Sequence, residues 1–155
     1  MFEIGDKVVY PMHGAGIIEA IEEKEILGDK QNYYIMNIRN MLVMFPMESN
    51  LGIRQIVDSD TIEDVLKGFN DDVSDPTLNP SQRYRSNMNK MKTGDIYQGA
   101  QVIRELIHMS KKRALATGDK NMLDNARQIL ISELVLVKGI APEQADDLLD
   151  DFLAN

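Results

Sequence analysis

Cationic side chains gather in one stretch of an otherwise acidic chain. The protein has 155 residues and a formal net charge of −8, yet residues 79–113 hold eight Lys and Arg against two acidic residues, Asp95 and Glu105. The cations are Arg83, Arg85, Lys90, Lys92, Arg104, Lys111, Lys112 and Arg113. Such an imbalance is typical of a surface that contacts phosphate groups. Solubility is the alternative role of Lys and Arg on helices, but the one-sided balance favours phosphate contact.

Residues able to carry out catalysis are scarce. The two histidines, His13 and His108, lie far apart in the sequence, and the chain has no cysteine, so it has no zinc-ligand cluster of ordinary spacing. Gly14 and Gly16 follow an expected strand without opening a helix, and they predict a tight turn of the sheet instead of a phosphate-binding loop. We therefore expect no catalytic residues, no cofactor and no enzymatic activity.

Four aspartates near the C-terminus form the remaining candidate ligand set. They are Asp146, Asp147, Asp150 and Asp151, and their i, i+3 and i+4 spacing could in principle hold a hard cation. Metal sites of this kind are built on loops that wrap around the ion, and a helix does not curl in this way. We interpret the run as the solvated outer face of a terminal helix and predict no metal site.

The part of the chain that precedes the cationic stretch is rich in predicted β-strands. The predicted strands cover residues 7–10, 17–26, 32–38 and 41–45, with a last strand near 51–54. These segments concentrate β-branched and aromatic residues between turn-forming residues. So many short strands within one small segment are typical of a strongly bent barrel of the SH3 or Tudor kind.

The cationic stretch itself predicts helices. Asn79 at the N-cap, Pro80 at N1 and Gln82 at N3 form a strong helix start. Apolar residues at helical spacing predict two further helices before Gly139, and Pro142 begins a last one.

These patterns predict an α+β fold with two domains. Residues 1–56 form the SH3/Tudor-like β-barrel, and residues 79–155 form an all-α helical bundle. Residues 57–78 between them hold a short helix at 59–69 and a polar linker.

Composition places the protein in the cytoplasm. The N-terminus lacks the basic and apolar regions of a signal peptide, and no apolar run approaches the ~18 residues of a membrane span. Residues 1–78 carry fifteen acidic and six basic side chains. A protein this acidic is poorly suited to coating nucleic acid, so we expect a protein partner to deliver it to DNA. An RNA- or ribosome-associated small-barrel binding module is the alternative interpretation.

Several motifs resemble the CarD/CdnL family of bacterial transcription regulators, over essentially the whole chain and in the same order. The motifs are Gly5-Asp6-Lys7-Val8-Val9-Tyr10-Pro11-Met12-His13-Gly14-Ala15-Gly16, Pro46 followed by Glu48, Arg83-Tyr84, Asp119-Lys120-Asn121-Met122-Leu123, Ala126-Arg127-Gln128-Ile129-Leu130 and Glu133-Leu134. The resemblance implies that a Tudor-like N-terminal domain binds a lobe of the RNA polymerase β subunit. It also implies that the helical domain contacts promoter DNA near the upstream edge of the transcription bubble. Such a regulator stabilises the open complex without catalysis, and we expect it to be a monomer.

The family resemblance and the positions of the charged residues together indicate which residues bind DNA. The candidate DNA-binding residues are Pro80, Gln82, Arg83, Arg85, Lys90 and Lys120. Pro80 occupies the position of a family Trp that wedges into the minor groove, and Lys120 matches a family position associated with the DNA backbone.

The candidate polymerase-binding residues are Lys24, Arg39 and Met44. Lys24 keeps one basic position of the family, whereas Met44 lies near a second basic position and lacks the charge. Arg39 is the residue that could compensate for that loss.

Overall fold

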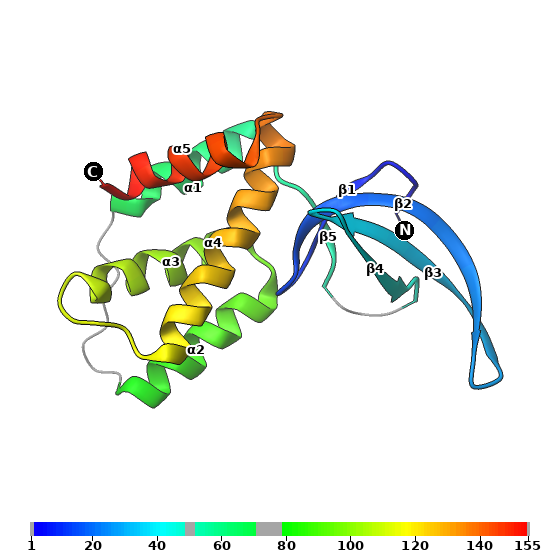
Figure 1. Ribbon diagram of the computed structural model, residues 1–155, viewed down its shortest axis with the longest axis horizontal. Helices are drawn as coiled ribbons and strands as arrows, with labels where there is room; N and C mark the ends of the chain where they lie inside the picture. The colour runs from blue at the N-terminus through cyan, green and yellow to red at the C-terminus, as the bar shows by residue number, and fades with distance from the viewer. Residues whose placement is uncertain (1, 49–51, 71–78, 155) are drawn as a thin grey trace.

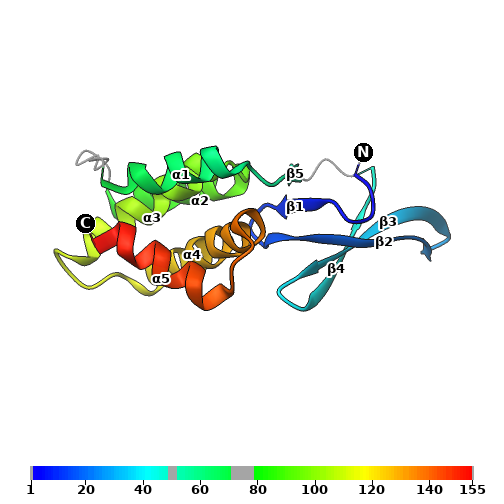
Figure 2. The same cartoon turned by 90° about the horizontal axis from the view of Figure 1, so that it is seen from above.

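The computed structural model describes residues 2–48, 52–70 and 79–154, and it places an antiparallel sheet beside a group of helices (Figure 1). A view turned by 90° shows the same arrangement, with the sheet at one end of the long axis and the helices at the other (Figure 2). The strands come first in the chain and the helices follow. The predicted α+β class is therefore confirmed.

The sheet is curved and entirely antiparallel. Its strands are β1 (Lys7–Tyr10), β2 (Gly14–Ile26), β3 (Asp29–Ile38), β4 (Met41–Pro46) and β5 (Arg54–Gln55). They lie in the order β4-β3-β2-β1-β5, so β4 and β5 are the edges. One face buries an apolar cluster of Val8, Ile18, Tyr34, Met36, Ile38 and Phe45. Most of the predicted strands thus form where apolar and β-branched residues concentrate. Part of the predicted strand near 51–54 lies outside the described residues.

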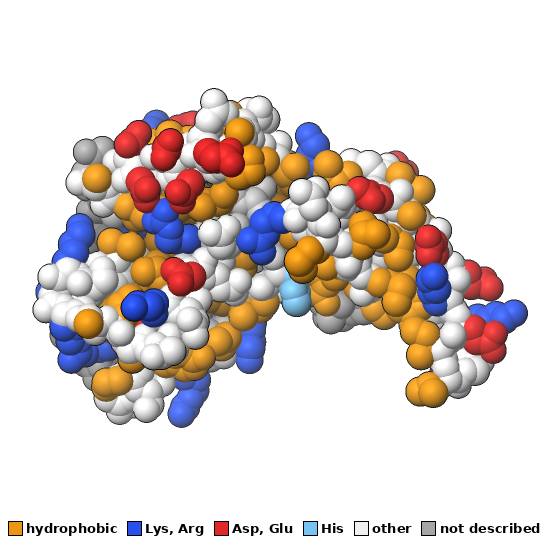
Figure 3. All heavy atoms as spheres, viewed as in Figure 1, with side chains coloured by type: hydrophobic (Ala, Val, Ile, Leu, Met, Phe, Trp, Pro, Cys, Tyr) orange, Lys and Arg blue, Asp and Glu red, His pale blue; other side chains and the backbone are white. Residues whose placement is uncertain are grey.

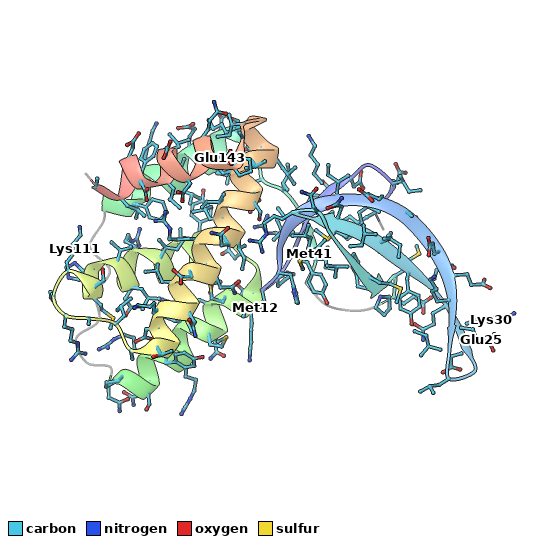
Figure 4. The ribbon with its side chains drawn as sticks, viewed as in Figure 1. Met12, Glu25, Lys30, Met41, Lys111 and Glu143 are labelled. Carbon is cyan, nitrogen blue, oxygen red and sulfur yellow. The ribbon has the colours of Figure 1, made fainter. Side chains whose placement is uncertain are left out.

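The hairpin of β2 and β3 extends past the rest of the sheet. Strand β4 pairs only with residues 33–38 of β3, so residues 24–31 form a two-stranded arm. Glu25 and Lys30 lie at the end of this arm (Figure 4). The side chain of Leu27 in its turn is fully exposed.

The prediction that Gly14 and Gly16 form a tight turn is wrong. The turn is made by residues 11–13, and both glycines lie in β2. Gly14 has φ +126°, a backbone conformation that other residues rarely adopt. A Cβ on Gly16 would lie 2.1 Å from the carbonyl oxygen of Asn37, so β3 passes too close to accept any side chain there.

Five α-helices make up the rest of the described chain. They are α1 (Ser59–Lys67), α2 (Pro80–Thr93), α3 (Ile96–Ser110), α4 (Thr117–Lys138) and α5 (Pro142–Ala154), and a 3-10 turn, η1 (Gly68–Asn70), follows α1. The helix starts predicted at Pro80 and Pro142 and the end predicted at Gly139 are confirmed. Of the helices in the described part of the chain, none combines the length and apolar character that a bilayer crossing requires.

The helices enclose a second apolar core. Helix α4 supplies the largest share of its buried residues, including Leu130 and Leu134. Helix α1 also packs into this core through Ile62, Val65 and Leu66, although it precedes the segment that the sequence analysis interpreted as a linker. The helical unit therefore begins before Asn79.

Polar contacts join the sheet to the helices. Arg54 of β5 donates from both Nη atoms to the Glu133 carboxylate of α4, each at 2.8 Å, and Glu133 is 1% exposed. The Val57 N–H also donates to Glu133, at 2.9 Å. Nearby, the Ala15 N–H donates to Ser132 Oγ at 2.8 Å. These bonds fix the orientation of the sheet relative to α4.

Candidate nucleic-acid and protein interfaces

Helix α2 carries most of the candidate DNA-binding residues, and its own sequence holds it in shape. Asn79 Oδ1 accepts a hydrogen bond from the Gln82 N–H at 2.9 Å, and Gln82 Oε1 accepts one from the Asn79 N–H at 3.1 Å. This capping box satisfies two backbone donors at the helix start. Gly94 ends the helix in the left-handed conformation. Gln82 therefore has a capping role besides any contact with DNA.

The outer face of α2 is flanked by two shallow hollows. One lies between α2 and the start of α4, and Pro80, Arg85 and Lys92 line it together with Tyr84 and Met88. The other hollow lies along the opposite flank of α2; among its lining residues are Gln82, Arg85, Lys90 and Gln98. Arg85 lines both hollows, so it lies between Pro80 on one flank and Gln82 and the half-buried Lys90 on the other. We call the surface formed by these four residues the α2 face.

Arg83 does not belong to the α2 face. Its Nε lies 3.7 Å from Glu105 Oε1 on α3, and its side chain is 15% exposed. A partly buried ion pair of this kind fixes one helix on another more than it offers charge to a ligand. The role of Arg83 in DNA contact stays a prediction, and the structure adds a packing role.

Further cations lie on other parts of the helical unit. Lys120 is exposed in the first turn of α4, next to Asp119, which lines the hollow shared with Pro80. Lys111, Lys112 and Arg113 are exposed after the end of α3. Lys and Arg side chains appear along the lower and left margins of the helical unit in Figure 3, whereas acidic side chains cluster on α5 at its top. Positive and negative charge therefore gather on different sides of the helices.

The aspartates of α5 have a structural partner. Arg127 Nη2 donates to Asp146 Oδ1 at 3.0 Å and to Asp150 Oδ1 at 2.8 Å. Burial lowers the pKa of Arg127, but the hydrogen bonds to Asp150 and Asp146 outweigh burial and leave the pKa raised. Carboxylate oxygens of Asp146, Asp147 and Asp150 lie within 4.8 Å of one another. The ion pairs with Arg127 account for two of these three carboxylates, Asp146 and Asp150, and the absence of a metal site stays a prediction.

The sheet offers a second surface, on the face opposite its core. Met44 pairs with Ile35, which pairs with Ala20, so these three side chains form one row across the outer face. The Lys24 and Gln31 pair lies two rows further along the same face. Lys24 and Met44 thus lie on the same face of the sheet.

This outer surface is apolar along the edge strand. Leu42 and Met44 of β4 point to the same side and are 65% and 45% exposed. Lys24 adds a positive charge, and its Nζ lies 3.1 Å from the Glu22 carboxylate, in an exposed pair of small energetic value. We call Leu42, Met44, Ile35, Ala20 and Lys24 the outer sheet face.

Arg39 lies apart from Lys24. It occupies the turn between β3 and β4 with φ +51°, and its Nη1 donates to Gln128 Oε1 of α4 at 3.2 Å. It lines the cleft between the sheet and α4, together with residues such as Ile17 and Val135. Its side chain is directed toward the helices, away from the Lys24 end of the outer sheet face.

Two family models match the chain in the order of its two structural units. The model described as CarD-like/TRCF RID domain matches residues 2–57, and the model described as CarD, C-terminal domain matches residues 64–150. The chain belongs to the CarD/CdnL family. The Bacillus subtilis (strain 168) protein named "Putative transcription factor YdeB" is 51% identical over 148 residues, which cover 93% of this chain and 97% of that protein.

Family membership confirms the resemblance read from the sequence motifs. It also confirms a Tudor-like fold for the sheet, because the RID domain has that fold. CarD proteins are transcription regulators and are not a known enzyme family. The matches end at residue 57 and begin again at residue 64, on either side of the start of α1.

Sequence reasoning missed several residues of these surfaces. Leu42 was not singled out, although β4 reads Met-Leu-Val-Met-Phe, with apolar residues on both alternating faces. An edge strand with a solvated face ordinarily alternates with polar residues, so this uninterrupted apolar run was an available signal of an interface. Arg54 and Glu133 were also missed, and no local pattern could have paired them because 79 positions separate them.

Proposed function

We propose that this protein is a non-enzymatic transcription regulator that binds the RNA polymerase β subunit and contacts promoter DNA to stabilise the open complex. The outer sheet face is the polymerase-binding surface, and the α2 face is the DNA-contacting surface. One observation carries the proposal: the two surfaces belong to different structural units whose orientation is fixed by the Arg54–Glu133 pair. A molecule whose sheet and helix α4 keep a fixed relative orientation can hold DNA close to a set position relative to polymerase.

The outer sheet face has the chemistry of a protein-docking surface. Exposed Leu42 and Met44 supply apolar area, and Lys24 supplies a charge that can select an acidic neighbour. Strand β4 is also an edge of the sheet, so its outward backbone groups are available to a strand of the partner. The alternative RNA-binding module has less support, because Glu22, Glu23 and Glu25 are exposed around this region.

Met44→Glu is expected to weaken binding of the purified chain to the isolated β-subunit lobe by about 30-fold or more, because an apolar anchor at an interface centre is worth roughly 2 kcal/mol or more. Titration calorimetry measures the effect, with Lys24→Glu expected to weaken binding less. Leu27→Glu is the control, since Leu27 is also apolar and is fully exposed but lies at the end of the arm. Wild-type affinity of Met44→Glu would contradict this assignment.

The α2 face has the chemistry of a phosphate-contacting surface. Arg85, Lys90 and Lys92 project from one helix beside the exposed Pro80, with no base-reading arrangement apparent among them. Phosphate contacts position a protein on DNA and carry little sequence information. We therefore expect weak, salt-sensitive and largely sequence-independent affinity for DNA in the absence of polymerase.

Arg85→Ala is expected to lower DNA affinity about equally for different promoter sequences and to reduce the slope of log K against log salt concentration by about 1, because one phosphate contact is lost. Fluorescence anisotropy with a forked promoter fragment at several salt concentrations measures both. Lys67→Ala, which removes an exposed cation from α1, is the control and should change neither. An unchanged slope for Arg85→Ala, or a sequence-specific nanomolar complex of the wild type without polymerase, would contradict the proposal.

A further inference from the structure

The helix proposed to meet DNA is the most weakly packed of the three central helices. Only Asn87 and Met91 of α2 are buried, whereas α3 buries six residues and α4 buries eight. Tyr84 of α2 is 40% exposed. Segments with few buried apolar contacts open more readily than the core. The attachment of α2 is therefore a weak point of the helical unit.

The contact between α2 and its neighbours is also unusually polar. The Asn87 side chain is fully buried, and neither its Oδ1 nor its Nδ2 has a hydrogen-bond partner among the described residues. One turn earlier, Arg83 pairs with Glu105 at 3.7 Å. An unpaired buried amide destabilises the packed arrangement, since the same amide forms hydrogen bonds when it reaches water. Outward movement of Asn87 would remove this penalty.

The two ends of α2 are held differently. At the C-terminal end the Gly94 carbonyl accepts a hydrogen bond from Arg54 Nε at 2.7 Å, and Arg54 is itself bound to Glu133. Gly94 also lies against Pro11, where an added Cβ would come within 2.8 Å of Pro11 Cγ. The N-terminal end, with Pro80, lies far from this junction (Figure 1). The capping box stabilises the start of the helix itself, and in that half the ion pair described for α2 is the longer Arg83–Glu105 contact at 3.7 Å. The Gly94 end is therefore the more firmly held end of α2.

We infer that α2 is a movable lever that pivots at Gly94, and that Asn87 is the positioning residue that keeps its resting position weakly held. The inference deepens the proposed function and rests on it, because the surface that moves is the α2 face. An outward swing exposes the Asn87 amide and carries Arg85 and Lys90 with it. The α2 face thereby adjusts to a phosphate backbone while the junction with the sheet stays fixed.

Hydrogen exchange of the free protein, followed by mass spectrometry, tests the lever, because α2 loses its packing when it swings out, and a helix of 14 residues is marginal in water without packing. Amides of α2 are expected to exchange at least about tenfold faster than those at the centre of α4. Asn87→Leu keeps a similar volume and removes the amide, so it is expected to slow exchange in α2 by about tenfold and to raise the melting temperature. Asn89→Leu is the matched control, because Asn89 is exposed two residues later and should leave α2 exchange unchanged.

Two results would overturn the inference. They are α2 exchange in the wild type as slow as that of α4, and α2 exchange in Asn87→Leu as fast as in the wild type. The wild-type comparison is decisive even if that variant does not fold. Because these measurements need neither DNA nor polymerase, they separate the lever from the proposed function, which fails instead if Arg85→Ala leaves the salt slope unchanged.

Discussion

Replacing Glu133 by Ala is expected to destabilise the folded protein by about 3 kcal/mol, because it breaks a buried ion pair by removing one partner. The Glu133 carboxylate is almost completely buried and accepts hydrogen bonds from both Arg54 Nη atoms and from the Val57 N–H. Without it, the guanidinium, which is only 26% exposed, loses its counter-ion. The partly buried backbone donor of Val57 also loses its acceptor.

Chemical denaturation measures this loss. Glu143→Ala, an exposed carboxylate at the start of α5, is the control and should change the free energy of unfolding by no more than about 0.5 kcal/mol. The double variant Arg54→Met with Glu133→Leu is expected to recover much of the stability, since apolar residues of similar size often replace a buried ion pair without loss. A free energy of unfolding for Glu133→Ala within about 0.5 kcal/mol of the wild-type value would show that the Arg54–Glu133 pair contributes little to stability.

The same variant also tests why the two surfaces must be joined rigidly. Loss of Glu133 leaves the outer sheet face and the α2 face intact, but it removes the ion pair between β5 and α4 and the partner that holds Arg54 beside the Gly94 carbonyl. Binding to the β-subunit lobe should therefore persist at temperatures where the variant remains folded. The lifetime of the open complex should fall, since DNA is no longer held at a fixed position relative to polymerase.

The elements of this fold were predictable where a local signal determines them. Asn79, Pro80 and Gln82 mark the start of α2 because capping chemistry depends only on residues within one turn. Gly139 marks the end of α4 for the same reason. The strands could be predicted from runs of β-branched and aromatic residues. The cationic character of α2 could be predicted from the excess of Lys and Arg in its sequence.

The features that sequence reasoning missed depend on contacts between distant residues. The contact of Arg83 with Glu105 was not expected, because only the packing of α3 on α2 brings Glu105 within reach; the role of Arg83 in DNA contact stays a prediction. The contact of Arg39 with Gln128 of α4 was not expected either, and the docking role of Arg39 also stays a prediction. Gly14 and Gly16 were interpreted as turn residues from their local sequence. Position 16 requires glycine for a different reason, because the backbone of Asn37 on the next strand leaves no space for a side chain.

Gly16→Ala is therefore expected to destabilise the protein by about 3 kcal/mol, at the upper end of the usual cost of overpacking. The added Cβ would meet the carbonyl oxygen of Asn37 at 2.1 Å and its carbonyl carbon at 2.9 Å. These are backbone atoms of a paired strand, so the clash cannot be relieved by rotating a side chain. Relief requires β2 and β3 to separate near Ala15, whose N–H is bonded to Ser132 on α4.

Gly99→Ala is the matched control because the chemical change is identical and the environment is the opposite. Gly99 lies in α3 with nothing within 4 Å of an added Cβ, and Ala is the better helix former. This control is expected to stabilise the protein by about 0.5–1 kcal/mol. Thermal unfolding of the two variants should therefore shift the midpoint in opposite directions. A shift of both midpoints in the same direction, or equal stability of the two variants, would contradict the close approach of β3 to Gly16.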